Sequence, residues 1–123
     1  MKIRIKGNYI RYRLTQSEVK LLSDQGQIAE TTCFGSHPSQ VFTYALVATD
    51  KVIDLSADFD GQKITMYLPI EAAKNWNQEE RVGFQHSQEV APGQVLQLLL
   101  EKDFVCLDDT AEDQSDNYAN PKR

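Results

Sequence analysis

Five of the first thirteen residues are cationic, and none of the thirteen is acidic. The five cations are Lys2, Arg4, Lys6, Arg11 and Arg13. Cationic side chains that share one surface attract anions, such as the carboxylates of an acidic polypeptide or the phosphates of a nucleic acid. Whether these five act together depends on the elements that carry them.

A β-hairpin over residues 2–14 would place the five cations on one face. Ile3 and Ile5 alternate with the cations, which is the period of a half-buried strand. Gly7-Asn8 is a two-residue turn signal, and a second alternating strand follows it. The turn sets apolar positions of both strands on the core side, namely Ile3, Ile5, Ile10, Tyr12 and Leu14. We call the opposite side the basic face, and it holds Lys2, Arg4, Lys6, Tyr9, Arg11 and Arg13. The alternative interpretation is a solvated sheet face that binds nothing.

The most acidic stretch of the chain lies at its other end. Residues 108–116 carry Asp108, Asp109, Glu112, Asp113 and Asp116. Residues 108–123 contain no aliphatic side chain larger than alanine, so the sequence predicts a disordered acidic tail. The expected partners of the basic face are this tail or an acidic protein. Nucleic acid is disfavoured, because Tyr9 is the only aromatic side chain expected on that face for stacking on bases.

A second group of residues has the types needed for acid–base or thiol chemistry. His86, Cys106 and Glu101 would form a polar cluster if the fold brought them together in a cavity. Cys33 and His37 offer only one loose half of a metal site. Both cysteines lie in apolar runs, which predicts buried, reduced thiols. The sequence therefore predicts no catalytic residue, cofactor or metal, and it favours a protein that is not an enzyme.

The chain resembles itself at an offset of 54 residues, which aligns residues 1–49 with residues 55–103. Matching pairs include Gly7 with Gly61, Ile10 with Ile64, Leu14 with Leu68 and Pro38 with Pro92. Each half reads as two strands, a helix and two further strands. We therefore expect two ββαββ units related by a pseudo-twofold axis.

Local signals place the elements of each unit. Residues 15–18 (TQSE) form a capping box, and Gly26 is expected to end the helix that follows it. In the second unit, strands are expected over residues 52–59, 81–87 and 94–107, and a helix after Pro69. Residues 95–100 are mostly apolar on both sides, which predicts a central strand covered on both faces.

These elements predict an α+β fold of about eight mostly antiparallel strands and two short helices, either barrel-like or two-layered. Residues 1–107 would form one globular domain, with residues 108–123 as the tail. The hydrophobic fraction of 41% and charged fraction of 25% are ordinary for such a domain. No apolar run reaches the roughly 20 residues of a membrane span, and the first residues lack a signal peptide's apolar core. A cytoplasmic location is therefore expected.

Both ends of the chain resemble a family of small uncharacterised bacterial proteins. Residues 1–8 (MKIRIKGN) and 14–19 (LTQSEV) resemble the start of that family. Residues 101–104 (EKDF) and 106–107 (CL), with Glu112-Asp113 and Asn120-Pro121, resemble its other end. The resemblance covers nearly the whole chain and implies a stand-alone bacterial domain. The family has no assigned activity, so no catalytic residue follows from it.

Two classes of function remain open. The first is a non-enzymatic binding or regulatory domain that acts through the basic face. The second is a small-ligand-binding protein or enzyme with a pocket between the two repeats. The polar cluster of His86, Cys106 and Glu101 would favour the second class if it lined a concave cavity.

Overall fold

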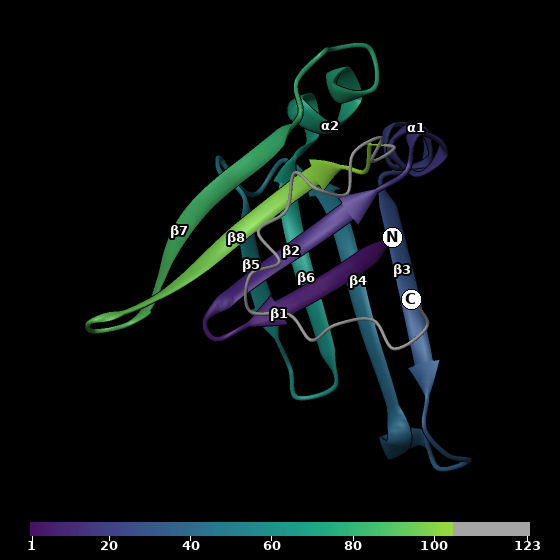
Figure 1. Cartoon of the computed structure of the whole chain (residues 1–123), viewed down its shortest axis with the longest axis vertical. Coiled ribbons are helices and arrows are strands. Elements are labelled where there is room, and N and C mark those ends of the chain that lie inside the picture. Colours follow the sequence, from purple (N-terminus) through teal and green to yellow (C-terminus); the bar gives the residue numbers. More distant parts are fainter. Residues whose placement is uncertain (105–123) are drawn as a thin grey trace, which may run out of the picture.

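Eight strands and two helices make up residues 1–104, the part of the chain that the computed structural model describes (Figure 1). The first half contains β1 (Lys2–Lys6), β2 (Tyr9–Leu14), α1 (Gln16–Gln25), β3 (Gln27–Cys33), a 3₁₀ turn η1 (Pro38–Gln40) and β4 (Val41–Thr49). The second half contains β5 (Ser56–Phe59), β6 (Lys63–Pro69), α2 (Ile70–Trp76), β7 (Gly83–Ala91) and β8 (Gln94–Lys102). Both halves therefore have the order ββαββ.

The strands form two four-stranded sheets, and each sheet takes one hairpin from each half. One sheet has the order β1-β2-β8-β7 and the other has the order β3-β4-β6-β5. The four hairpins are antiparallel, whereas the central pairs β2–β8 and β4–β6 are parallel. The fold is α+β as predicted. The sheets are separate, so the two-layer alternative is correct and the barrel is not.

The same 54-residue offset also maps the strand pairing of the first sheet onto that of the second. Tyr9 pairs with Gln97 in the first sheet, and their counterparts Lys63 and Thr43 pair in the second. The β7–β8 hairpin departs from this rule. In the β3–β4 hairpin, Gln27 lies opposite Val47, so the offset predicts residue 81 opposite Glu101, but Gly83 lies there instead. The displacement is two residues, an even number, so the same side chains still face the core.

The two helices lie together at one end of the sheets, at the top of Figure 1. Thr15 caps α1 by accepting from the Glu18 backbone N–H, and the Glu18 carboxylate accepts from the Thr15 backbone N–H at 2.8 Å. Gly26 ends α1 with a φ of 80°, a conformation that favours glycine. This predicted helix is confirmed at both ends.

One hydrophobic core joins both sheets to both helices. Its largest fully buried side chains are Tyr12, Leu14, Leu22, Leu46, Met66, Leu68, Trp76, Leu98 and Leu100. The Tyr12 ring lies 5.9 Å from the Tyr44 ring on the facing sheet. The inward positions expected in the first hairpin agree for Ile10, Tyr12 and Leu14, whereas Ile5 remains 53% exposed.

Three expectations about strands and thiols are wrong. β5 begins at Ser56 rather than residue 52, and Ile53 before it is 93% exposed. β8 is central, but it ends at Lys102, and Val95 and Gln97 on its outer side are exposed, so described residues cover only one of its faces. Cys33 is exposed, because it ends an edge strand beyond the reach of the core. Cys106 and the acidic tail lie outside the described residues.

Candidate functional site

The register of the first hairpin places all six residues of the basic face on one side of the sheet. Lys2 lies opposite Arg13, Arg4 opposite Arg11, and Lys6 opposite Tyr9. Directly opposed side chains project to the same face, and like charges in such pairs destabilise a sheet by about 0.2–1 kcal/mol. The hairpin thus keeps an arrangement of cations that is unfavourable for the fold.

Glu101 on β8 partly neutralises the basic face. The parallel register sets Glu101 beside Arg13, and its carboxylate accepts from Arg13 Nε at 2.8 Å. Arg11 Nε lies 3.6 Å from the same carboxylate oxygen. The Glu101 side chain is only 18% exposed, so this contact is screened less than a pair in open water.

The other counter-charge is Asp103, just after β8. Its carboxylate lies 3.1 Å from Lys2 Nζ, and its backbone N–H donates to Leu14 O at 2.8 Å. Arg4 and Lys6 are exposed and form no ion pair with another residue in the range 1–104. Within residues 1–104, two of the five cations therefore have no ion-pair partner.

A shallow depression of about 150 Å³ lies among the cations. It is lined by Lys2, Ile3, Arg4, Arg11 and Arg13. This volume suits one carboxylate or a similar small oxyanion, and it is well below the 300–1,000 Å³ typical of pockets for drug-sized ligands.

The counterpart hairpin shows that the fold does not require these cations. In β5–β6, Ser56 lies opposite Tyr67 and Asp58 lies opposite Thr65. These four residues occupy the places of Lys2, Arg13, Arg4 and Arg11, in that order, in the same strand arrangement. One hairpin carries five cations where the other carries mostly neutral or acidic side chains.

The second predicted group does not assemble. His86 lies opposite Leu98, which is buried, so His86 faces the interior as its spacing suggested. Glu101 belongs to the alternate set of β8 positions and faces outward with the basic face. Cys106 lies beyond the described residues. A strand places alternate residues on opposite faces, and this separates the histidine from the carboxylate.

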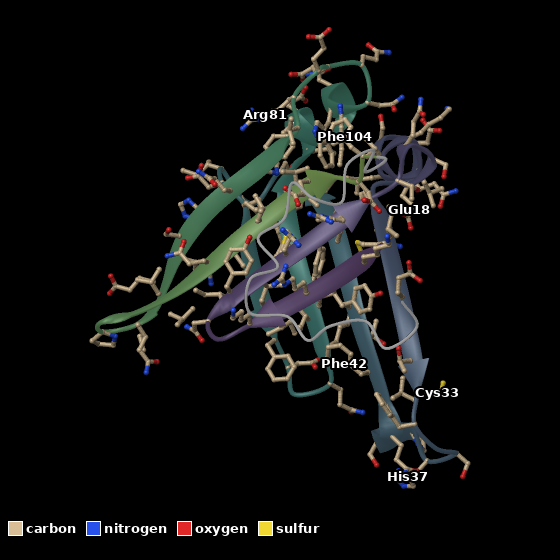
Figure 2. The ribbon with its side chains drawn as sticks, viewed as in Figure 1. Glu18, Cys33, His37, Phe42, Arg81 and Phe104 are labelled. Carbon is tan, nitrogen blue, oxygen red and sulfur yellow. The ribbon has the colours of Figure 1, made fainter. Side chains whose placement is uncertain are left out.

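Cys33 and His37 lie at the far tip of the β3–β4 hairpin (Figure 2). His37 is bound locally, because its Nδ1 accepts from the Ser39 backbone N–H at 3.1 Å and begins η1. No third His, Cys, Asp or Glu of residues 1–104 joins them in a group that could hold a metal. Cys33 and His37 are therefore part of the connection between β3 and β4.

A larger cleft of about 530 Å³ lies where the two halves meet. The first half contributes Ile5, Gly7, Asn8 and Ile10, and the second contributes Ala57, Asp58, Phe59, Ile64, Gln88, Glu89, Val90 and Leu96. Sequence reasoning anticipated a pocket between the repeats but none of its residues. A signal for it was that apolar residues keep the core-facing phase of their strands as far as two turns, at Phe59 and at Val90, where the structure leaves them exposed.

The N-terminal ammonium group of Met1 is held between two carboxylates. It donates to Glu18 and to Glu30, the latter at 2.5 Å. Partial burial alone would raise the pKa of Glu18, but hydrogen bonds from the ammonium and from Thr15 outweigh it and lower that pKa. Desolvation alone would lower the pKa of the Met1 amine, but the two carboxylates outweigh this effect and raise that pKa. This cluster anchors β1 to α1 and β3.

The described residues define a small α+β domain of two mixed four-stranded sheets. The chain belongs to DUF7009, a family of unknown function whose model matches residues 1–122. No curated protein and no solved structure matches the chain. Among residues 1–104, neither helix has the length and apolar character needed to cross a membrane.

Proposed function

We propose that this protein is a non-enzymatic binding domain whose basic face holds an acidic polypeptide segment. The single observation that carries the proposal is the register of β1 and β2, which sets Lys2 opposite Arg13 and Arg4 opposite Arg11. Mutual repulsion makes this arrangement costly, and the counterpart hairpin folds without it. A bound anion would remove the repulsion.

An acidic polypeptide fits this face better than a nucleic acid does. Glu101 and Asp103 lie among the cations and would repel a continuous phosphate backbone. Tyr9 is the only aromatic side chain on the hairpin's side of the face, so there is no platform for several stacked bases. Carboxylates spaced along an extended chain can approach Arg4 and Lys6 and avoid the two resident acids.

The chain's own residues 108–116 are the nearest acidic segment. The described chain ends at Phe104, next to Asp103, which contacts Lys2 at the border of the basic face. Tethering would raise the local concentration of such a segment to the millimolar range, so a weak affinity would suffice for it to compete. We propose that this segment competes with an external acidic partner, and that the domain acts in the cytoplasm.

We also take the two ββαββ halves to be copies of one unit related by a pseudo-twofold axis. The shared order of elements and the related pairing of Tyr9–Gln97 and Lys63–Thr43 support this interpretation. In this view the repeat maintains the core, and the outer face of the first hairpin diverged to bind a partner.

The test is binding of fluorescent poly-glutamate by the full chain at low and high salt. The variant Arg4→Ser/Lys6→Ser should weaken binding several-fold, because it removes the two cations without a described partner. Lys51→Ser/Lys63→Ser changes the net charge equally at exposed positions elsewhere and should leave the affinity unchanged. Equal effects of the two double variants would refute a local site. Tighter binding of an oligonucleotide than of poly-glutamate would refute the choice of partner.

A further inference from the structure

Each of the two sheets has two edge strands, and an edge strand exposes backbone N–H and C=O groups that a further strand can bind. The edges are β1 and β7 in the first sheet, and β3 and β5 in the second. Proteins usually protect such edges with charged side chains, bulges, short strands or a covering segment. Within residues 1–104, three of the four edges have such protection and the edge of β3 has none.

The protection differs from edge to edge. β1 carries three cations in five residues. β5 is four residues long, and the Gln88 side chain of β7 binds both the N–H and the C=O of Ala57 on its open side. β7 has a bulge between Glu89 and Ala91. β3 lies at the other border of the second sheet, on the right of Figure 1.

β3 is long, regular and almost uncharged. Its seven residues (QIAETTC) contain no proline and pair with β4 without a bulge. Its only charged side chain is Glu30, which accepts from the Met1 ammonium group at 2.5 Å. Ala29, Thr31 and Cys33 are exposed. The described part of the chain therefore leaves this edge open to another strand.

The backbone groups of Ala29, Thr31 and Cys33 point to the open side of β3. Successive residues of an antiparallel pair direct their N–H and C=O groups alternately toward the partner strand and away from it. Gly26 O accepts from a backbone N–H of β4 at 2.8 Å, and Phe34 N–H donates to the carbonyl oxygen that ends η1 at 2.7 Å. Even-numbered positions of β3 therefore face β4, and odd-numbered positions present their hydrogen-bonding groups outward.

We propose that this edge pairs with the same edge of a second copy of the chain, in antiparallel orientation and centred on Thr31. In this register, Thr31 lies opposite Thr31 of the second copy, and Ala29 lies opposite Cys33 of the second copy. All three outward positions then form hydrogen-bonded pairs, and the β3–β4–β6–β5 sheets of the two copies become one continuous sheet. The contact does not use the basic face, which lies on the first sheet, so it holds whether or not that face binds a partner.

The charges beside this edge favour a second copy over the acidic segment of residues 108–116. The Glu30 side chain is 42% exposed, and the Glu18 carboxylate shares the Met1 ammonium group with it. A strand that carries several carboxylates would be repelled here, because like charges on neighbouring strands are destabilising. A second copy of β3 adds a single carboxylate.

The same reasoning selects the register. Pairing centred on Glu30 would set the two Glu30 carboxylates directly opposite each other, whereas pairing centred on Thr31 sets Glu30 opposite Thr32 of the second copy. Pairing centred on Ala29 would set Cys33 opposite residue 25, which belongs to α1, and leave the Cys33 backbone groups unpaired. Only the register centred on Thr31 avoids both defects.

The test is sedimentation of the full-length protein from about 5 µM to about 500 µM, where a monomer–dimer equilibrium is expected. Thr31→Pro removes a backbone N–H that lies outside the β3–β4 ladder, and proline is tolerated at such edge positions. The dimer loses both of its central hydrogen bonds, so its dissociation constant should rise about tenfold or more.

A matched pair of lysine variants localises the contact. Thr31→Lys sets two ammonium groups opposite each other in the dimer and should raise the dissociation constant about fivefold. Thr65→Lys makes the same change on the same side of the sheet, but on the central strand β6, and should leave dimerisation unchanged. Thermal melts establish that each variant is folded.

Cross-linking tests the register. In a Cys33→Ser/Cys106→Ser background, Thr31→Cys should form an intermolecular disulfide under mild oxidation, because hydrogen-bonded partners have Cα atoms about 5.5 Å apart. Ala29→Cys in the same background should not, because the Ala29 residues of the two copies are four positions out of register.

Four results would overturn the proposal. The first is a protein that stays monomeric throughout this concentration range, as it would if residues 105–123 occupied the edge. The second is a dimer that neither Thr31→Pro nor Thr31→Lys weakens. The third is equal weakening by Thr31→Lys and Thr65→Lys, which would move the contact to the face of the sheet. The fourth is cross-linking at position 29 and not at position 31.

Discussion

The Gln88 side chain forms two hydrogen bonds with the backbone of Ala57, at 2.8 Å and 3.0 Å, and so links the two sheets of the domain. Both partners are partly buried, and the backbone groups of Ala57 have no ladder partner on that side. Gln88→Leu should therefore lower the free energy of unfolding by about 1–3 kcal/mol, because it leaves two polar groups unsatisfied. Urea unfolding measures this change. Gln85→Leu, on the exposed side of the same strand, is the control and should change stability by less than about 0.5 kcal/mol.

Thr15→Ala should destabilise the domain by about 1 kcal/mol, the usual loss for a helix N-cap. The Thr15 hydroxyl accepts from the Glu18 N–H and also donates to the Glu18 carboxylate at 3.0 Å. Gln16→Ala changes an exposed residue of the same helix and should have little effect. A thermal or urea melt that shows equal losses for both variants would contradict the role of the cap.

Stability should fall as the pH is lowered through the depressed pKa of Glu18. A carboxyl group whose pKa is lower in the folded state than in the unfolded state stabilises the fold above its unfolded pKa, and that contribution disappears on acidification. The Met1 amine has the opposite sign, because its pKa is raised on folding and its contribution disappears at alkaline pH. Glu18→Gln should flatten both limbs of a stability profile measured by urea unfolding from pH 3 to pH 10. Glu71→Gln, at an exposed site in α2, should leave the profile unchanged.

Glu101→Gln should strengthen binding of poly-glutamate and steepen its loss with salt. The substitution removes the carboxylate shared by Arg11 and Arg13 and so raises the positive potential of the basic face. Neutralising residues 108, 109, 112, 113 and 116 in the full chain should act in the same direction if that segment competes for the face. Fluorescence anisotropy at two salt concentrations measures both effects. Weaker binding after either change would contradict the proposed function.

Cys33 should react with an alkylating reagent at the rate of a cysteine in a short peptide. It is exposed at the end of β3, so no folded structure of residues 1–104 shields it. The variant Cys106→Ser leaves Cys33 as the single thiol, and mass spectrometry follows its labelling. Labelling that speeds up on addition of denaturant would indicate that Cys33 is protected after all.

Most of the local structure was predictable from short-range signals. The Thr15–Glu18 capping box and Gly26 bound α1 as expected, because cap chemistry depends on residues within a few positions of one another. The Gly7-Asn8 turn fixed the register of β1 and β2, so the membership of the basic face followed from the sequence. Errors occurred where burial decides the outcome. Ile53 and Cys33 lie in strand-like or apolar runs, but no other element packs over them.

Local periodicity and turn geometry specified the order ββαββ in each half, the helix caps and the grouping of five cations on one hairpin face. Which strands of the two halves neighbour one another could be learned only from the packed fold. The parallel pairing of β2 with β8 brought Glu101 to Arg11 and Arg13, and separated it from His86. The meeting of β5 with β7 formed the cleft braced by Gln88 and Ala57. Such contacts join residues 30 to 90 positions apart, and no local rule specifies them, because they arise from the common burial of two apolar sheet faces.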